Sequence, residues 1–175
     1  MPRCRTCKQP TDQRFGLTYA CSVEHALQFV NAQAAKREKA RHQQRKADLK
    51  TLPQLVKEAQ AAFNAYIRGR DADLPCISCG VFGPRKWDAG HYLSTGSHPE
   101  LRFDESNCHK QCVHCNQHKS GNQAMFRIGL LMRLGETEVS RLEGPQEPLK
   151  LTREQAIEIK QTYRVKLREL TKTNS

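Results

Sequence analysis

The sequence predicts a small α+β domain that is clamped by zinc, flanked by helices and preceded by a separate zinc-binding segment. Two Cys-x2-Cys pairs lie about thirty residues apart, and uncharacteristically polar residues lie between and just after them. Only 37% of the residues are hydrophobic, which is too few to build a large apolar core. A structural zinc site contributes about 10–16 kcal/mol in zinc-finger peptides, so bound metal can supply the missing stability.

The spacing of the two central pairs is typical of a four-thiolate structural zinc site. Each pair offers two sulfurs from one tight turn, and two pairs complete a tetrahedron. The predicted ligands are Cys76, Cys79, Cys112 and Cys115. Polar residues suit a small interior poorly unless some chemistry needs them. The zinc clamp would hold four of them in register, namely Asp88, His91, Asn107 and Asn116.

The charge balance indicates an anionic partner. In 175 residues, 29 Lys and Arg stand against 18 Asp and Glu, which gives a net charge of +11. Nucleic acid is the first candidate for such a basic chain. We expect a cytoplasmic protein without membrane contact, because the first residues are charged and polar and no apolar run approaches membrane-spanning length. In a reducing compartment these cysteines favour zinc over disulfides.

Residues 1–28 form a second candidate zinc segment. A Cys-x2-Cys pair is followed by a cysteine and, four residues later, by a histidine, and Ser22 is a plausible N-cap of a helix that would present the last two on one face. The alternative is free cysteines and a surface histidine. The predicted ligands are Cys4, Cys7, Cys21 and His25.

The sequence of residues 29–52 predicts a basic helical arm. From Ala26 to about Lys50 there is no Gly or Pro, and between Lys36 and Lys50 seven basic residues stand against two acidic ones, a net +5. Such a helix has almost no apolar face, so it is either a solvated connector or an arm that contacts phosphates. The candidate DNA contacts are Arg37, Lys39, Arg41, Arg45 and Lys46, together with Arg102 and Lys119 further along the chain.

Residues 53–135 are expected to form the central core. Pro53 suits a helix start, and a four-residue apolar spacing predicts a helix that ends near Gly69. Its inward stripe is Leu55, Ala59, Phe63 and Ile67. A second helix is expected from Asn122 to Leu134, closed by Gly135, with Met125, Ile128, Leu131 and Met132 pointing inward.

Residues 136–175 are expected to hold a loop and a last helix. Thr152-Arg-Glu-Gln155 has the pattern of a capping box, which places the helix start there. The apolar stripe of this helix must pack either on this domain or on a second copy of the chain. It comprises Ala156, Ile159, Tyr163, Leu167 and Leu170.

The polar residues of the core suit phosphodiester cleavage. One histidine and one divalent metal can together activate water, stabilise charge on phosphorus and help the 3′ oxygen leave. A hard metal such as Mg²⁺ or Mn²⁺ prefers the oxygens that Asp88 and Asn116 supply, while His91 supplies the base. Asp88 could instead hold the turn before His91, and Asn116 could cap the helix after the second cysteine pair.

The order of these motifs resembles the His-Asn-His, or ββα-metal, nucleases, in which a zinc-clamped hairpin carries the catalytic histidine and the following helix a metal ligand. His91, Asn107 and Asn116 stand at the three matching points. Asp88-Ala-Gly-His91 is similar to the Asp-Arg-Gly-His motif of nonspecific members, with Ala89 in place of arginine. Asp88-x-x-His91 with Cys115-Asn116 also looks like the endonuclease VII type of junction resolvase.

Most of the chain resembles the NinG, or Rap, recombination nucleases of lambdoid phages. The resemblance is carried by residues 73–80, 87–92, 101–103, 109–112 and 115–122, and by the N-terminal Cys/His cluster, in which His25 stands where that family would have cysteine. It implies an endonuclease that cuts branched recombination intermediates, such as Holliday junctions and D-loops, in the cytoplasm of a bacterial host. Phage recombination proteins and a homodimer are the implied partners.

Three further expectations concern roles other than catalysis. Asn107 is expected to fix the loop that aims His91, Cys108 to lie in the core, and His109, His114 and His118 to contact phosphates or solvent. The rival interpretation is a zinc-finger DNA-binding or recombination accessory protein without catalysis. It explains the cysteines and the charge but leaves Asp88, His91 and Asn116 without a function.

Overall fold

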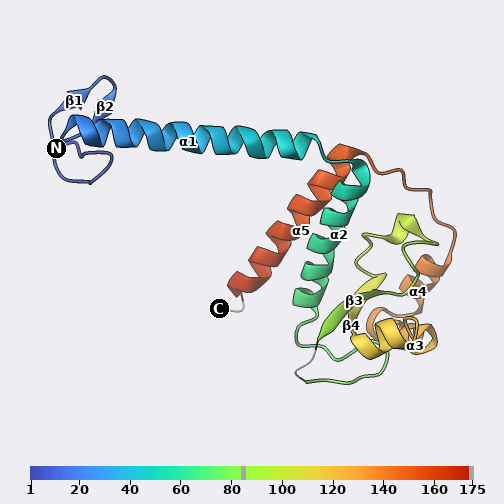
Figure 1. The fold of residues 1–175 in the computed structure, drawn as a ribbon. Coiled ribbons are helices and arrows are strands. Elements are labelled where there is room, and N and C mark those ends of the chain that lie inside the picture. The colour runs from blue at the N-terminus through green and yellow to red at the C-terminus, as the bar shows by residue number, and fades with distance from the viewer. Residues whose placement is uncertain (84–85, 174–175) are drawn as a thin grey trace. The chain divides into compact units, whose positions relative to one another are not determined.

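The computed structural model describes residues 1–83 and 86–173, which fold as helices and two small antiparallel sheets, in agreement with the predicted α+β class. The chain divides into two compact units, Met1–Lys50 and Thr51–Ser175. Figure 1 shows the elements of each unit. In chain order they are β1 Arg14–Phe15, β2 Thr18–Tyr19, α1 Val23–Asp48, α2 Leu52–Arg70, β3 Trp87–His91, η1 Pro99–Leu101, β4 Cys108–Cys112, η2 His114–His118, α3 Gln123–Leu134, α4 Glu136–Glu143 and α5 Arg153–Thr173.

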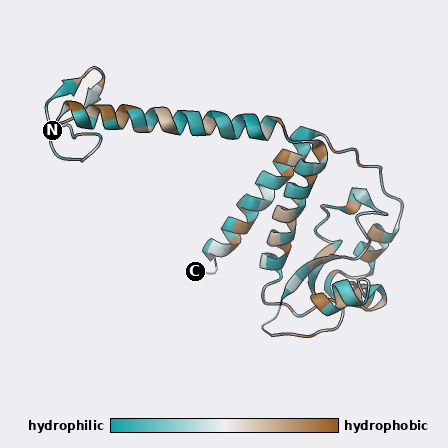
Figure 2. Ribbon diagram, viewed as in Figure 1, coloured by the Kyte–Doolittle hydropathy of each residue, from teal (hydrophilic) through white to brown (hydrophobic). Residues whose placement is uncertain are grey.

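The first unit consists of a short hairpin and the long helix α1. Ser22 caps the helix as predicted, because its Oγ accepts a hydrogen bond of 3.2 Å from the amide of His25. Every side chain from 31 to 46 is exposed, and the helix is hydrophilic along this stretch (Figure 2). Within the part of the chain that the structure describes, each helix is too short or too polar to cross a lipid bilayer.

Helices α2 and α5 pack against each other and form one core of the second unit. The predicted stripe of α2 is buried, and Phe63 and Ile67 from it join Tyr163 of α5 in one cluster. The helices meet closely at Gly69, where an added Cβ would lie 2.9 Å from Cδ1 of Leu167. The apolar stripe of α5 is therefore used within the chain, and the expected homodimer stays a prediction.

Strands β3 and β4 form the antiparallel hairpin that carries the candidate site. Their register pairs Trp87 with Cys112 and His91 with Cys108. Asp71, directly after α2, fixes the hairpin to that helix because its Oδ2 accepts a hydrogen bond of 2.9 Å from the amide of Lys110. Cys108 is fully buried beside α2 and α5, so its predicted place in the core is confirmed.

Helices α3 and α4 close the other side of the hairpin, and here one prediction is wrong. Met125, Ile128 and Met132 were expected to point inward, but they are 44%, 50% and 83% exposed. The buried residues of α3 are Phe126 and Leu130, while Leu131 is partly buried as expected. α3 carries two apolar stripes, and packing chooses the one that includes Gly129, where a Cβ would lie only 2.0 Å from the carbonyl oxygen of Ile77.

Candidate functional site

The two central cysteine pairs converge as predicted. Cys76 and Cys79 follow α2, Cys112 ends β4, and Cys115 lies in the π-helical turn η2. Their four sulfur atoms all lie within 4.8 Å of one another. The sulfurs of Cys79 and Cys112 are 3.8 Å apart, which is about the edge of a tetrahedron with Zn–S bonds of about 2.3 Å. This cluster could therefore hold zinc.

Hydrogen-bond donors face three sulfurs of the central cluster, although burial raises the pKa of the Cys112 and Cys115 thiols. The amide of Cys112 donates to the sulfur of Cys76, and the amide of Cys115 donates to that of Cys112, each at 3.4 Å. The Nδ2 of Asn122 approaches the sulfur of Cys115 at 3.5 Å. Hydrogen bonds to a charged ligand stabilise it and orient it toward the metal. The hairpin, η2 and the start of α3 are thus tied to one centre.

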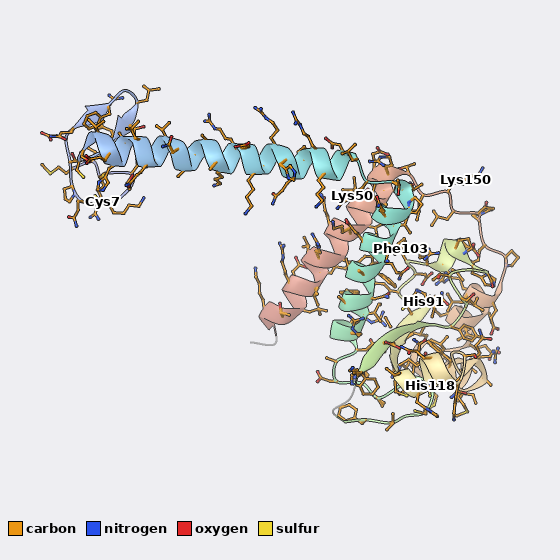
Figure 3. The ribbon with its side chains drawn as sticks, in the orientation of Figure 1. Cys7, Lys50, His91, Phe103, His118 and Lys150 are labelled. Atoms are coloured by element: carbon orange, nitrogen blue, oxygen red, sulfur yellow. The ribbon has the colours of Figure 1, made fainter. Side chains whose placement is uncertain are left out.

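The N-terminal cluster also assembles from its four predicted residues. The three sulfurs and the His25 ring nitrogen lie within 4.8 Å of one another. Cys7 and Cys21 sulfurs are 3.6 Å apart, and His25 Nδ1 is 3.8 Å from the sulfur of Cys4. Its position in α1, one turn after Cys21, lets His25 act as the fourth ligand. This second cluster could hold a zinc ion of its own. Figure 3 labels Cys7, one of its four residues.

The hairpin brings Asp88 and Asn116 together. Asp88 lies in β3 and Asn116 in η2, and Nδ2 of Asn116 donates to Oδ2 of Asp88 at 2.8 Å. Gln117 donates to the same oxygen at 2.8 Å. Both Asp88 and Asn116 are partly exposed. The amide oxygen of Asn116 and the second carboxylate oxygen of Asp88 are oxygen ligands of the kind that hard divalent cations prefer.

His91 lies on the opposite face of β3 from Asp88. Side chains alternate along a strand, so His91 shares a face with Ala89 and packs toward α2, with its ring centroid 6.0 Å from that of Phe63. Figure 3 labels His91 at the end of β3. Its Nε2 lies 3.0 Å from the carbonyl oxygen of Arg102, and its Nδ1 lies 3.7 Å from the sulfur of Cys108. The described contacts of His91 therefore include neither Asp88 nor Asn116.

The imidazole of His91 is held neutral with a defined tautomer. Because a carbonyl can only accept, Nε2 carries the proton and Nδ1 is left unprotonated. Burial lowers the pKa of His91 below its usual 6.5; the bond to the Arg102 carbonyl opposes this shift, and the charge of Arg102 adds to it. A neutral histidine with one unprotonated ring nitrogen is the form that a general base needs.

Asn107 fixes the loop that follows β3. Its Oδ1 accepts from the amide of Leu93 at 2.8 Å, and its Nδ2 donates to the carbonyls of Leu93 and Leu101 at 3.0 and 3.1 Å. The side chain is fully buried. These bonds close the segment between β3 and η1 against the start of β4, as expected for a residue that positions the end of β3.

Gly90 in the Asp88–His91 motif is required by packing. Gln111, which pairs with Asp88 across the hairpin, is fully buried. Its Nε2 donates to Ser78 Oγ at 2.7 Å and to the carbonyl of Gly121 at 2.6 Å. A Cβ at position 90 would lie 2.2 Å from Oε1 of Gln111. Any side chain at position 90 would displace Gln111, which ties Ser78, between Cys76 and Cys79, to the turn before α3.

Sequence reasoning missed a buried charged network beside the hairpin. Asp71, 2% exposed, accepts bonds from Arg70 and lies 3.4 Å from Nδ1 of His109. Arg70 also donates to the carbonyl of Cys108 at 2.9 Å. Adjacent Arg and Asp after a helix are common on surfaces, so only the burial of His109 in β4, predicted instead to contact phosphate or solvent, identifies this network.

The candidate DNA contacts fall into two groups. The five basic residues of α1 and Lys119 are exposed and available to phosphates. Arg102 is partly exposed, and its guanidinium donates to Gln60 Oε1 at 3.3 Å and to the carbonyl of Thr95 at 3.0 Å. The structure thus gives Arg102 an internal role in the loop beneath His91. Its contact with DNA stays a prediction. His114 and His118 are exposed on η2, with ring centroids 6.0 Å apart.

Comparison with known proteins gives the family. The model of the family described as Bacteriophage Lambda NinG protein matches residues 1–174. The chain belongs to the NinG family. This NinG chain is 40% identical to Protein ninG of Escherichia phage 933W over an alignment of 191 residues, which covers 99% of this chain and 95% of the relative.

Two shorter alignments have higher identity. The NinG chain is 49% identical over 131 residues to Protein ninG of Salmonella phage P22, and 48% identical over 131 residues to that of Escherichia phage lambda. Each alignment covers 75% of this chain and 64% of the relative. No solved structure matches the chain. The names of these relatives state a family and a phage source but no activity.

Proposed function

We propose that this NinG protein is a metal-dependent endonuclease that cuts branched DNA. The observation that carries the proposal is the pairing of Asp88 with Asn116 at 2.8 Å on a hairpin that a four-cysteine cluster clamps. A carboxylate and an amide oxygen on such a frame can hold Mg²⁺ or Mn²⁺. When bound, the metal would stabilise negative charge on the phosphate and the leaving oxygen.

His91 is the proposed general base. Its Nε2–H is anchored on the Arg102 carbonyl, and its pKa is lowered by burial, so Nδ1 is free to take a proton at neutral pH. In the structure Nδ1 faces Cys108. The proposal therefore requires the His91 ring to leave Cys108 and turn toward the edge of β3 when DNA binds. His91 is the last residue of that strand.

Branched DNA is proposed as the substrate on two grounds. The net charge of +11 and the exposed basic face of α1 favour a polyphosphate partner. The resemblance to recombination nucleases of lambdoid phages then narrows the polymer to junctions and D-loops. A four-way junction concentrates more phosphates in a small volume than a linear duplex, so a protein with two basic units gains most there.

The test compares cutting of a four-way junction and a linear duplex with Mg²⁺, Mn²⁺ or EDTA. We expect cutting only with divalent metal, and we expect Asp88→Ala and Asn116→Ala to abolish it. Asp73→Ala, which removes an exposed carboxylate, is the matched control and should cut normally. His91→Ala should slow single-turnover cutting about 10²- to 10⁴-fold while junction binding changes only a few-fold, since a base acts in the transition state.

A DNA-binding protein without catalysis is the second candidate. It is favoured by the position of His91, which lies on the α2 side of β3, away from Asp88 and Asn116. Under this alternative the wild-type protein binds the junction and never cuts it under any metal condition. His118→Ala, an exposed histidine on η2, serves as the control for His91→Ala and distinguishes loss of a base from loss of any histidine.

A further inference from the structure

An aromatic side chain between Cys79 and β3 is exposed without an evident packing role. Phe82 is 60% exposed. Among the described residues, it belongs to none of the three apolar clusters of the second unit. A single exposed apolar side chain is common on protein surfaces, so the surroundings of this ring decide whether it has a role.

One part of the Phe82 ring is held against a buried cation. Lys110 of β4 is only 3% exposed, and its Nζ lies 5.6 Å from the centroid of Phe82 and 4.5 Å from that of Trp87. The same Nζ donates to the carbonyl of Ala72 at 2.7 Å, which fixes the lysine in place. The ammonium group of Lys110 therefore lies against both rings on their protein side, and the outer part of the Phe82 ring stays exposed.

A cationic hollow lies next to these rings. Its volume is about 370 Å³, and it is lined by Arg68, Ala72, Trp87 and Lys110. Two of the four lining residues are cations and none is acidic. The exposed Lys86 precedes Trp87 in the chain. An aromatic ring with a free face beside such a hollow has the chemistry that binds single-stranded nucleic acid, in which a base stacks on the ring and cations pair with phosphates.

We propose that Phe82, supported by Lys110, stacks on an unpaired base of branched DNA while Arg68 and Lys86 contact the flanking phosphates. The proposal rests on the DNA partner of the proposed function and specifies which part of the branch is read. An intact duplex keeps its bases stacked and cannot offer a face to a side chain, whereas a branch point or a displaced strand can. The cationic lining favours this occupant over an apolar protein surface.

The experiment measures binding in EDTA, so that it does not depend on cutting. Full-length protein is titrated into a three-way junction with one unpaired 2-aminopurine at the branch, and into a fully paired duplex of equal length. We expect the fluorescence of the unpaired base to be quenched by wild type. Phe82→Ala should lose about 5- to 100-fold in junction affinity, the range for one base–aromatic stack, and little in duplex affinity.

Two variants make the result specific. Met132→Ala removes another strongly exposed apolar side chain, on α3, and should bind both DNAs like wild type. Phe82→Trp keeps an aromatic face and should restore quenching and junction affinity. Zinc content and circular dichroism of Phe82→Ala should match those of wild type, because an exposed ring contributes little to folding.

The outcomes separate this inference from the proposed function. Equal affinity losses for junction and duplex, or no loss at all, would overturn the base-stacking role even if the protein cuts DNA with Mg²⁺. A selective loss for the junction would support it even if no metal condition yields cutting. A Phe82 that docks a protein instead would leave both DNA affinities unchanged, which also counts against the proposal.

Discussion

At the scale of single residues, the pair Asp71 and His109 determines how the hairpin responds to pH. Arg70 can only donate, so Nδ1 of His109 accepts from it at 3.0 Å and Nε2–H donates to the carbonyl of Ser106 at 3.2 Å. His109 is therefore neutral in the folded chain. Burial is the main reason that its pKa lies below 6.5; Asp71 opposes the shift, and Arg70 adds to it.

This neutral histidine predicts an acid-sensitive fold. In the unfolded chain histidine titrates near 6.5, so the unfolded state binds more protons between that value and the lower folded pKa. Stability is then full above about pH 6.5 and falls as the pH drops through the window, by at most about 1.4 kcal/mol per pH unit for one histidine. The measurement is urea unfolding at pH 7.5 and 5.5.

The variant His109→Gln isolates this effect from acid release of zinc. It should be less stable at pH 7.5 but should lose less free energy of unfolding between pH 7.5 and 5.5 than wild type. His118→Gln, which changes an exposed ring, should keep the wild-type loss. An unchanged loss in His109→Gln would mean that the histidine is already charged in the folded state.

At the scale of elements, local signals in the sequence predicted the helix ends and the buried faces of α2 and α5, but not the buried face of α3. The capping box at Thr152 is confirmed, since Thr152 and Gln155 exchange bonds of 2.9 and 3.2 Å. Gly135 adopts the expected positive φ of 80° after α3. The inward face of α3 was wrong because the choice depends on Ile77, which is distant in sequence. α4, starting directly after Gly135, was not foreseen.

The two cysteine clusters, each of which could hold zinc, support elements of very different size, and this predicts unequal effects of losing them. The central cluster ties the hairpin to η2 and α3, whereas the N-terminal cluster lies beside a small core of Cys4, Ala20 and Ala26. A structural zinc contributes about 10–16 kcal/mol in peptides, which rivals the stability of a whole domain. Cys79→Ser should therefore unfold the second unit, while Cys7→Ser should leave it folded.

Zinc content and thermal unfolding measure the difference. Wild type should contain two zinc ions per chain, and Cys7→Ser one, with the main cooperative transition within about 2 °C of wild type because the second unit has its own cores. Cys79→Ser should lack that transition. Protein that is purified without chelators and contains no zinc would refute both assignments.

At the scale of the whole molecule, the candidate site could be predicted in composition but not in arrangement. Cysteine spacing identified both clusters, because two sulfurs from one turn constrain each other locally. Asp88 and Asn116 were also expected to meet. The orientation of His91 could not be foreseen, since it depends on strand alternation and on Phe63 of α2, which lies far back in the chain. The bonds of Arg102 to Gln60 and Thr95 could not be foreseen for the same reason.

The distribution of charge between the two units leads to the last prediction. Residues 1–50 contain eleven Lys and Arg against four Asp and Glu, a net +7, which leaves +4 on the other 125 residues. If α1 binds phosphates, deleting residues 1–50 should weaken junction binding and flatten its salt dependence, by about 0.9 in log–log slope for each phosphate that the protein no longer neutralises. The second unit should remain folded, because its clusters and its cysteine site lie entirely within it.

A variant of the full-length chain separates the effect of charge from the removal of a whole unit. Arg37, Arg41 and Arg45 recur every four residues on one exposed stripe of α1, and changing all three to Gln leaves the N-terminal cysteine cluster intact. The slope should then flatten by up to about 2.7, at about 0.9 for each neutralised phosphate. Salt titrations of junction and duplex affinity provide the measurement. If both the deletion and the triple variant keep the wild-type slopes, α1 is only a connector, and DNA affinity must reside in the second unit.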